Sequence, residues 1–147
     1  MKNFKLMTLL LLALGMTISA APSFAEVGYI DYQKVLENYP AAQQAIKEID
    51  AKGLELQQYM VNKGREYKNL TTPVQKQNFE SQTSTEFAQK QEALMKLRMN
   101  KEDQIMSQVQ TAAKAVMVAQ RLDAILSDQV VFVGGVDVTD LVIQKLK

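Results

Sequence analysis

The stretch Thr71-Thr72-Pro73-Val74-Gln75 separates two long helical patterns in this 147-residue chain. Pro73 suits the first position of a helix, because the N–H that proline lacks would have no intrahelical partner there. Thr72 and Gln75 have the spacing of a capping box. The sequence therefore predicts that one helix ends and another begins here, at the tip of a helical hairpin whose turn lies near residues 71–73.

The outgoing helix of this hairpin is predicted to begin at Pro40. From Ala42 onward, steps of four and three residues select a mostly apolar series, as in a narrow coiled-coil seam. Gly53 and Gly64 each lower helix stability by roughly 1 kcal/mol relative to Ala, so we expect the arm to be flexible there. The predicted seam consists of Ala42, Ile46, Ile49, Gly53, Leu56, Met60, Lys63, Tyr67 and Leu70.

The returning helix is predicted to run from Pro73 to Ala119. Its distal half is weakly patterned, with Phe79 and Phe87 among polar residues, so we expect an arm that is firm at its root and looser at its tip. The methionines of both helices are expected mainly to pack one arm helix on the other. The second predicted seam, interrupted by Glu102, consists of Met95, Met99, Met106, Val109, Ala113 and Val116.

Strand-forming residues flank the arm on both sides. Val27-Gly28-Tyr29-Ile30 predicts a strand, and Asp31 is a suitable cap for a short helix from Tyr32 to Asn38. After the arm, Leu122 to Leu126 and Val130 to Val133 predict a β-hairpin.

The tail adds an extended Val136-Asp137-Val138 and a last helix capped by Thr139 or Asp137. Isolated strands are unstable in water, so these segments should meet in one body. The predicted organisation is a mostly α fold: residues 26–39 and 120–147 form a small β-rich body with a C-terminal helix, and residues 40–119 form the projecting hairpin arm.

The first 25 residues have the pattern of a secretory signal peptide. Lys2 and Lys5 precede an apolar run from Leu6 to Ile18, and Ser23-Phe24-Ala25 supplies small residues for cleavage before Glu26. The alternative is a retained anchor, but about 13 apolar residues span only about 20 Å of a hydrocarbon core roughly 30 Å thick. The pattern predicts export and cleavage.

Composition argues against nucleic-acid binding and catalysis. Removing Lys2 and Lys5 leaves 15 basic against 16 acidic residues, a formal net charge of −1. There is no His or Cys, no phosphate-binding glycine loop and no calcium-loop spacing, so we expect no catalytic residues, metal or cofactor. Asp137 and Asp140, near the last helix, are expected to cap it and to interact with its dipole.

Across the mature chain the order of elements and several segments resemble the Skp/OmpH family of periplasmic chaperones. The resemblance implies a homotrimer in which short strands of three subunits form a small barrel. Three helical hairpins would then enclose a space for unfolded outer-membrane proteins, held without ATP. The segments that carry it are Val27-Gly28-Tyr29-Ile30-Asp31, Lys34-Val35-Leu36, Tyr39-Pro40, Leu122-Asp123-Ala124-Ile125-Leu126, Val130-Val131-Phe132 and Val136-Asp137-Val138-Thr139-Asp140-Leu141-Val142-Ile143.

Adaptable apolar side chains suit the holding of unfolded chains. The candidate client-binding residues are Phe79, Phe87, Met60 and Tyr67, with Phe79 and Phe87 the better candidates because they lie in a polar stretch. A net charge of +2 between Met60 and Glu80 would concentrate any steering at the tip and gives thin support for weak contact with an anionic membrane surface. The alternative function is a structural coiled-coil envelope protein with no chaperone activity, which predicts continuous seams and no exposed apolar lining. The basic tip residues are Lys63, Arg65, Lys68 and Lys76.

Overall fold

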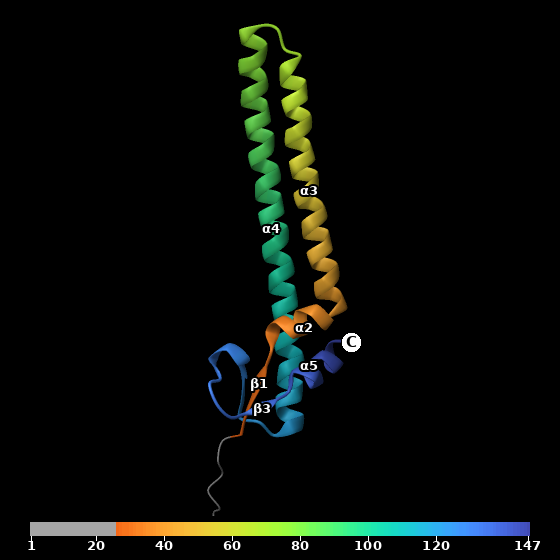
Figure 1. The fold of residues 1–147 in the computed structure, drawn as a ribbon, viewed down its shortest axis with the longest axis vertical. Coiled ribbons are helices and arrows are strands. Elements are labelled where there is room, and N and C mark those ends of the chain that lie inside the picture. Colours follow the sequence, from red (N-terminus) through yellow and green to blue (C-terminus); the bar gives the residue numbers. More distant parts are fainter. Residues whose placement is uncertain (1–25) are drawn as a thin grey trace, which may run out of the picture.

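The structure is a computed structural model that describes residues 26–147. Two long antiparallel helices project from a small body in which strands and short helices surround the arm's root (Figure 1). The predicted signal peptide, with its cleavage site, involves residues outside this range. The elements are β1 (Val27–Ile30), α2 (Tyr32–Asn38), α3 (Pro40–Lys68), α4 (Pro73–Gln120), β2 (Ala124–Ser127), a 3₁₀ turn (Asp128–Val130), β3 (Val136–Asp137) and α5 (Thr139–Leu146).

The body contains a parallel sheet in the order β2-β1-β3. Val27 pairs with Ala124 in β2, and Gly28 pairs with Val136 in β3. The predicted β-hairpin is therefore wrong: β2 pairs with β1, and the predicted second strand at residues 130–133 is a turn and an irregular segment. The first strand and the tail nevertheless meet in one body, as predicted.

Local capping explains where the arm helices begin and end. At the tip, the Thr72 hydroxyl accepts from the Gln75 N–H at 3.3 Å, and the Gln75 side chain accepts from the Thr72 N–H at 3.2 Å, which confirms the capping box. At the root, α4 ends on Arg121 in the left-handed conformation (φ 57°). The Leu122 N–H donates to the Met117 carbonyl at 2.9 Å. This bond satisfies a carbonyl group of the last turn of α4, although the left-handed C-cap residue is not glycine.

The main core lies where α2, α4 and α5 meet. Val35 of α2, Val116 of α4 and Val142 of α5 are almost completely buried. Val138 continues this core beneath the sheet and donates its N–H to the Tyr29 carbonyl at 3.0 Å. These contacts fix the root of α4 in the body, so the rest of the hairpin extends away from a firm base (Figure 1).

The contact between the arm helices follows most of the predicted α3 seam but only the body end of the predicted α4 seam, at Val109, Ala113 and Val116. On α4, Met95, Met99 and Met106 are 61%, 56% and 43% exposed, so the prediction that these methionines pack between the helices is wrong. The half-buried positions that replace them are Leu94, Leu97, Lys101 and Ile105. On α3, Ile46 and Met60 of the predicted seam are 43% and 42% exposed, and Ala45, outside that seam, is buried. The other seam positions are buried or half-buried, as predicted: Ala42, Ile49, Gly53, Leu56, Lys63, Tyr67 and Leu70.

Burial along the arm is graded. Fully buried residues of α3 and α4 occur only toward the body, at Ala42, Ala45, Val109, Ala112 and Val116. Toward the tip the best-covered side chains are half-buried. Within residues 26–147, the structure has no helix apolar enough over a sufficient length to cross a membrane.

Candidate functional site

One face of the arm is polar. Lys101 of α4 pairs with Glu48 of α3 at 2.7 Å, and the Tyr59 hydroxyl donates to the Glu86 carboxylate at 2.6 Å. This hydrogen bond and burial, followed by the nearby carboxylate charge, raise the pKa of Tyr59 to about 12. Such contacts hold the two helices in register along this face.

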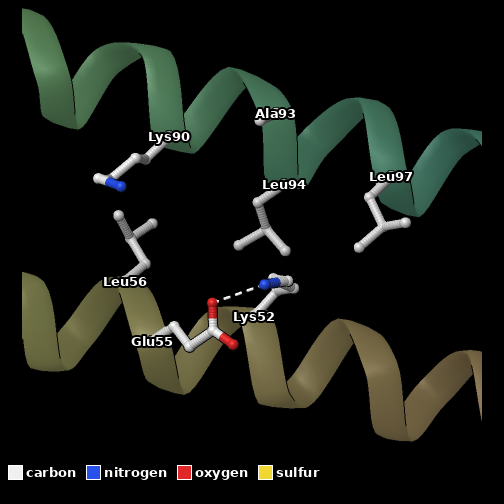
Figure 2. A pocket seen from close by; sticks show the side chains of 7 residues that line it. All are labelled: Lys52, Glu55, Leu56, Lys90, Ala93, Leu94 and Leu97. Atoms are coloured by element: carbon white, nitrogen blue, oxygen red, sulfur yellow. Dashed lines mark hydrogen bonds and ion pairs between the residues drawn. The ribbon is translucent and has the colours of Figure 1, made fainter.

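A hollow of about 330 Å³ interrupts the polar face at mid-arm. Figure 2 shows Leu94 of α4 pointing toward α3 above the Lys52–Glu55 ion pair, whose atoms are 2.7 Å apart. Leu56 points toward Lys90 in the same view. Because the Lys52–Glu55 ion pair and the Lys90 ammonium border the apolar floor, this hollow is less suited to apolar ligands than the groove described below.

The other face of the arm carries exposed methionines. Residues two positions apart in an α-helix point about 160° apart. Ala93 and Leu97 line the hollow of Figure 2, so Met95, which lies two residues from both, faces the other way. Ser84, Met95 and Met106 are spaced by eleven residues, about 20° more than three full turns, and therefore share one face of α4.

A groove of about 470 Å³ opens on this same face toward the tip of the arm, since Ser84 is one of its walls. The apolar part of the wall combines Met60 and Tyr67 of α3 with Phe79 and Phe87 of α4. The structure thus brings together all four predicted client-binding residues. The remaining walls are Lys63, Gly64, Glu80 and Thr83.

Charged groups and aromatic rings alternate around the groove. The Lys63 ammonium lies 5.2 Å from the centroid of the Phe79 ring, and the Lys76 ammonium lies 5.4 Å from that of Tyr67. The Tyr67 hydroxyl donates to Glu80 at 2.7 Å, and this bond raises the pKa of Tyr67. The Tyr67 and Phe79 rings are 6.1 Å apart and tilted by 50°. The groove is therefore an aromatic site with positive charge held beside its rings.

The predicted basic tip residues divide into two groups. Lys63 and Lys76 contact aromatic rings, whereas Arg65 and Lys68 are exposed in the last turn of α3. The sequence pattern indicated Gly64 only as a flexible point of the arm, and neither Thr83 nor Ser84 was predicted to be part of a site. The eleven-residue spacing of Ser84, Met95 and Met106 is the signal that could have revealed the exposed face.

A second exposed apolar surface belongs to the body. Val130, the last residue of the 3₁₀ turn, is 70% exposed, and in the segment that follows it Phe132 is fully exposed and Val133 is 86% exposed. This apolar segment belongs to the connection between β2 and β3, in the body and away from the arm's groove. No group of three or more metal-binding side chains occurs within residues 26–147.

Comparison with known families gives one decisive match. The family model described as Outer membrane protein (OmpH-like) matches residues 26–146, which is most of the chain. The chain belongs to the OmpH-like family. No individual curated protein matches the sequence significantly.

Membership confirms the resemblance that the flanking β segments and the arm predicted. OmpH-like proteins are periplasmic chaperones that bind outer-membrane proteins, and they are not enzymes.

Proposed function

We propose that this protein is an ATP-independent holding chaperone of the periplasm, which binds unfolded outer-membrane proteins and prevents their aggregation. The observation that carries the proposal is the exposed apolar face of the arm, from Met106 through Met95 to the groove at Phe79 and Phe87. Membership of the OmpH-like family supports the same class of client. Export by the predicted signal peptide, with cleavage before Glu26, belongs to this proposal.

The chemistry of the face suits holding. Unfolded barrel proteins expose apolar side chains and unpaired strand edges, and both drive aggregation. Methionine is flexible and polarizable, so Met95, Met99 and Met106 offer contact without demanding one client geometry. A spacer protein would gain nothing from leaving these side chains exposed, whereas a holding protein needs exposed apolar side chains to contact its clients.

The proposal includes self-association as a homotrimer. Strands of four, four and two residues give a small sheet, and the exposed Val130–Val133 segment beside it supplies an apolar surface for another copy. Three bodies joined in this way would place three arms around a shared space. Weak contact of the basic tip with anionic lipid remains a subordinate expectation, based on Arg65 and Lys68.

The test is a dilution experiment without nucleotide. A urea-unfolded outer-membrane barrel protein is diluted into buffer with a threefold excess of subunits of the mature chain, and aggregation is followed by light scattering. We expect scattering to be suppressed. Undiminished scattering would refute the holding function, and suppression that required ATP would refute the proposed mechanism.

A further inference from the structure

Gly64 leaves a gap in the wall of the tip groove that the fold does not require. A glycine inside a helix costs roughly 1 kcal/mol relative to alanine. A Cβ built at Gly64 would meet no atom within 4 Å, whereas one at Gly28 would come within 2.7 Å of Leu122. Packing explains why residue 28 is glycine but does not explain why residue 64 is. At Gly64 the missing side chain leaves open space in the wall of the groove.

The space at Gly64 is shaped for an apolar side chain. It forms part of a groove of about 470 Å³, within the roughly 300–1,000 Å³ range of small-ligand pockets. Met60 and Phe87 supply a flexible and a flat apolar wall, and Thr83 and Ser84 add two hydroxyl groups to the lining. A side chain with an apolar body and a polar edge matches both parts of this lining.

The charges around the groove favour an aromatic occupant over an aliphatic one. The Lys63 ammonium, which also pairs with Glu66 at 3.1 Å, lies 5.6 Å from the Tyr59 ring centroid and 5.2 Å from that of Phe79, so it is already a neighbour of two aromatic rings. A further ring in the groove would present its electron-rich face to the same cation. An aliphatic side chain would gain only the burial of its surface.

We propose that the Gly64 groove seats one aromatic side chain of an unfolded outer-membrane barrel protein. This inference rests on the proposed holding function and deepens it by naming the client feature that is recognised. Membrane barrels carry girdles of aromatic residues at both ends of their strands, so each client offers many such side chains. Recognition through single rings would leave the rest of the client chain free to move.

The variant Gly64→Leu fills the groove, and Gly53→Leu is its matched control. Gly53 lies eleven residues earlier in α3, on nearly the same helix face, and a Cβ there also meets no atom within 4 Å. Both changes replace glycine with a better helix former, so both variants are expected to fold at least as stably as the original chain.

The probes are two dye-labelled peptides of about twelve residues with alternating apolar and polar side chains, identical except for one Trp or one Leu at the centre. Binding is measured by fluorescence polarisation. The protein contains no Trp, so the emission of the peptide's own Trp reports directly on its surroundings. We expect the original chain and Gly53→Leu to bind the Trp peptide about three- to tenfold more tightly than the Leu peptide, with blue-shifted emission. Gly64→Leu should lose both the preference and the shift.

The remaining outcomes separate this inference from the holding function. If Gly64→Leu keeps the preference for Trp while the original chain suppresses barrel aggregation, the groove proposal fails and the holding function stands. If the original chain neither binds the peptides nor suppresses aggregation, both fail. If Gly64→Leu alters sedimentation and Gly53→Leu does not, the groove is a contact between copies, which also overturns the proposal.

Discussion

The hydroxyl of Thr139 donates a 2.6 Å hydrogen bond to the carboxylate of Asp137, and the backbone N–H of Thr139 donates to the same oxygen at 2.9 Å. Thr139 is buried and in turn accepts the Asp31 N–H at 3.0 Å. The N-cap of α5 is Val138, so neither predicted residue occupies that position; Asp137, one residue earlier, accepts the first N–H of α5, while Thr139 ties α5 to the end of β1.

Removing the Asp137 charge should make the free energy of unfolding depend less on pH in the acidic range. The Thr139 hydrogen bonds, and then the Lys34 charge, hold the pKa of Asp137 below its usual 3.8. A lowered carboxyl pKa stabilises the fold above the unfolded-state pKa, and this contribution disappears as pH falls through the folded-state value. We expect Asp137→Asn to destabilise the protein at neutral pH, by a margin that shrinks below about pH 4. Urea unfolding at several pH values measures the margin.

A control for this prediction is Asp103→Asn, which removes one exposed carboxylate from the middle of α4. It accounts for the general effect of losing a negative charge. A difference between Asp137→Asn and the original chain that stayed constant from pH 7 to pH 3 would contradict the role of Asp137 as a charged acceptor for the first N–H of α5.

Replacing Arg121 with glycine should stabilise the protein. Arg121 ends α4 with φ at 57°, a conformation that a side chain disfavours and glycine adopts freely. We expect Arg121→Gly to raise the free energy of unfolding by about 0.5–1 kcal/mol. The control Val118→Gly, three residues earlier inside the helix, should lower it by a similar amount. Chemical denaturation measures both, and a destabilising Arg121→Gly would show that the exit depends on the arginine side chain.

Neighbouring apolar positions of α4 should differ in their effect on stability. Met99 is 56% exposed, whereas Leu97 is half-buried against α3. We expect Met99→Gln to change the free energy of unfolding by less than about 0.5 kcal/mol, and Leu97→Gln to cost more than about 1 kcal/mol. Thermal unfolding of the two variants tests the assignment of faces. Equal costs would place Met99 in a packed interface.

A polar residue at position 132 should disrupt the proposed trimer. Phe132 is fully exposed in the isolated chain and lies in the apolar segment Val130–Val133. We expect Phe132→Ser to shift sedimentation toward the monomer, because it removes the largest apolar side chain of that surface. Val74→Ser, which changes an exposed apolar residue at the arm tip, is the control and should sediment as the original chain does. A trimer that survives Phe132→Ser would exclude this segment as its main contact.

Helix ends were predictable because their causes are local. Pro40 and Pro73 start α3 and α4, as predicted, and the Thr72–Gln75 capping box forms within four residues. The choice of strand partner was not predictable in the same way. Two apolar runs close in sequence indicated a hairpin, but β2 pairs with β1 from the other end of the arm.

The sequence allowed candidate client-binding residues to be chosen by residue type, but it did not show that they lie together. Phe79 and Phe87 stood out in a polar stretch, and Met60 and Tyr67 stood out as adaptable or aromatic. Their convergence on one groove depends on the alignment of α3 against α4, which the Tyr67–Glu80 and Glu48–Lys101 contacts define. No spacing within either helix carries that information.

The sequence by itself determined that this chain forms a capped helical hairpin flanked by short strands, because proline, capping side chains and apolar periodicity act over a few residues. Only the tertiary structure decided which apolar stripe of α4 packs and which is exposed. Leu94 and Met95 are neighbours about 100° apart and both apolar, so burial of either stripe would satisfy the pattern. The opposing surface of α3 selects the leucines and leaves the methionines exposed.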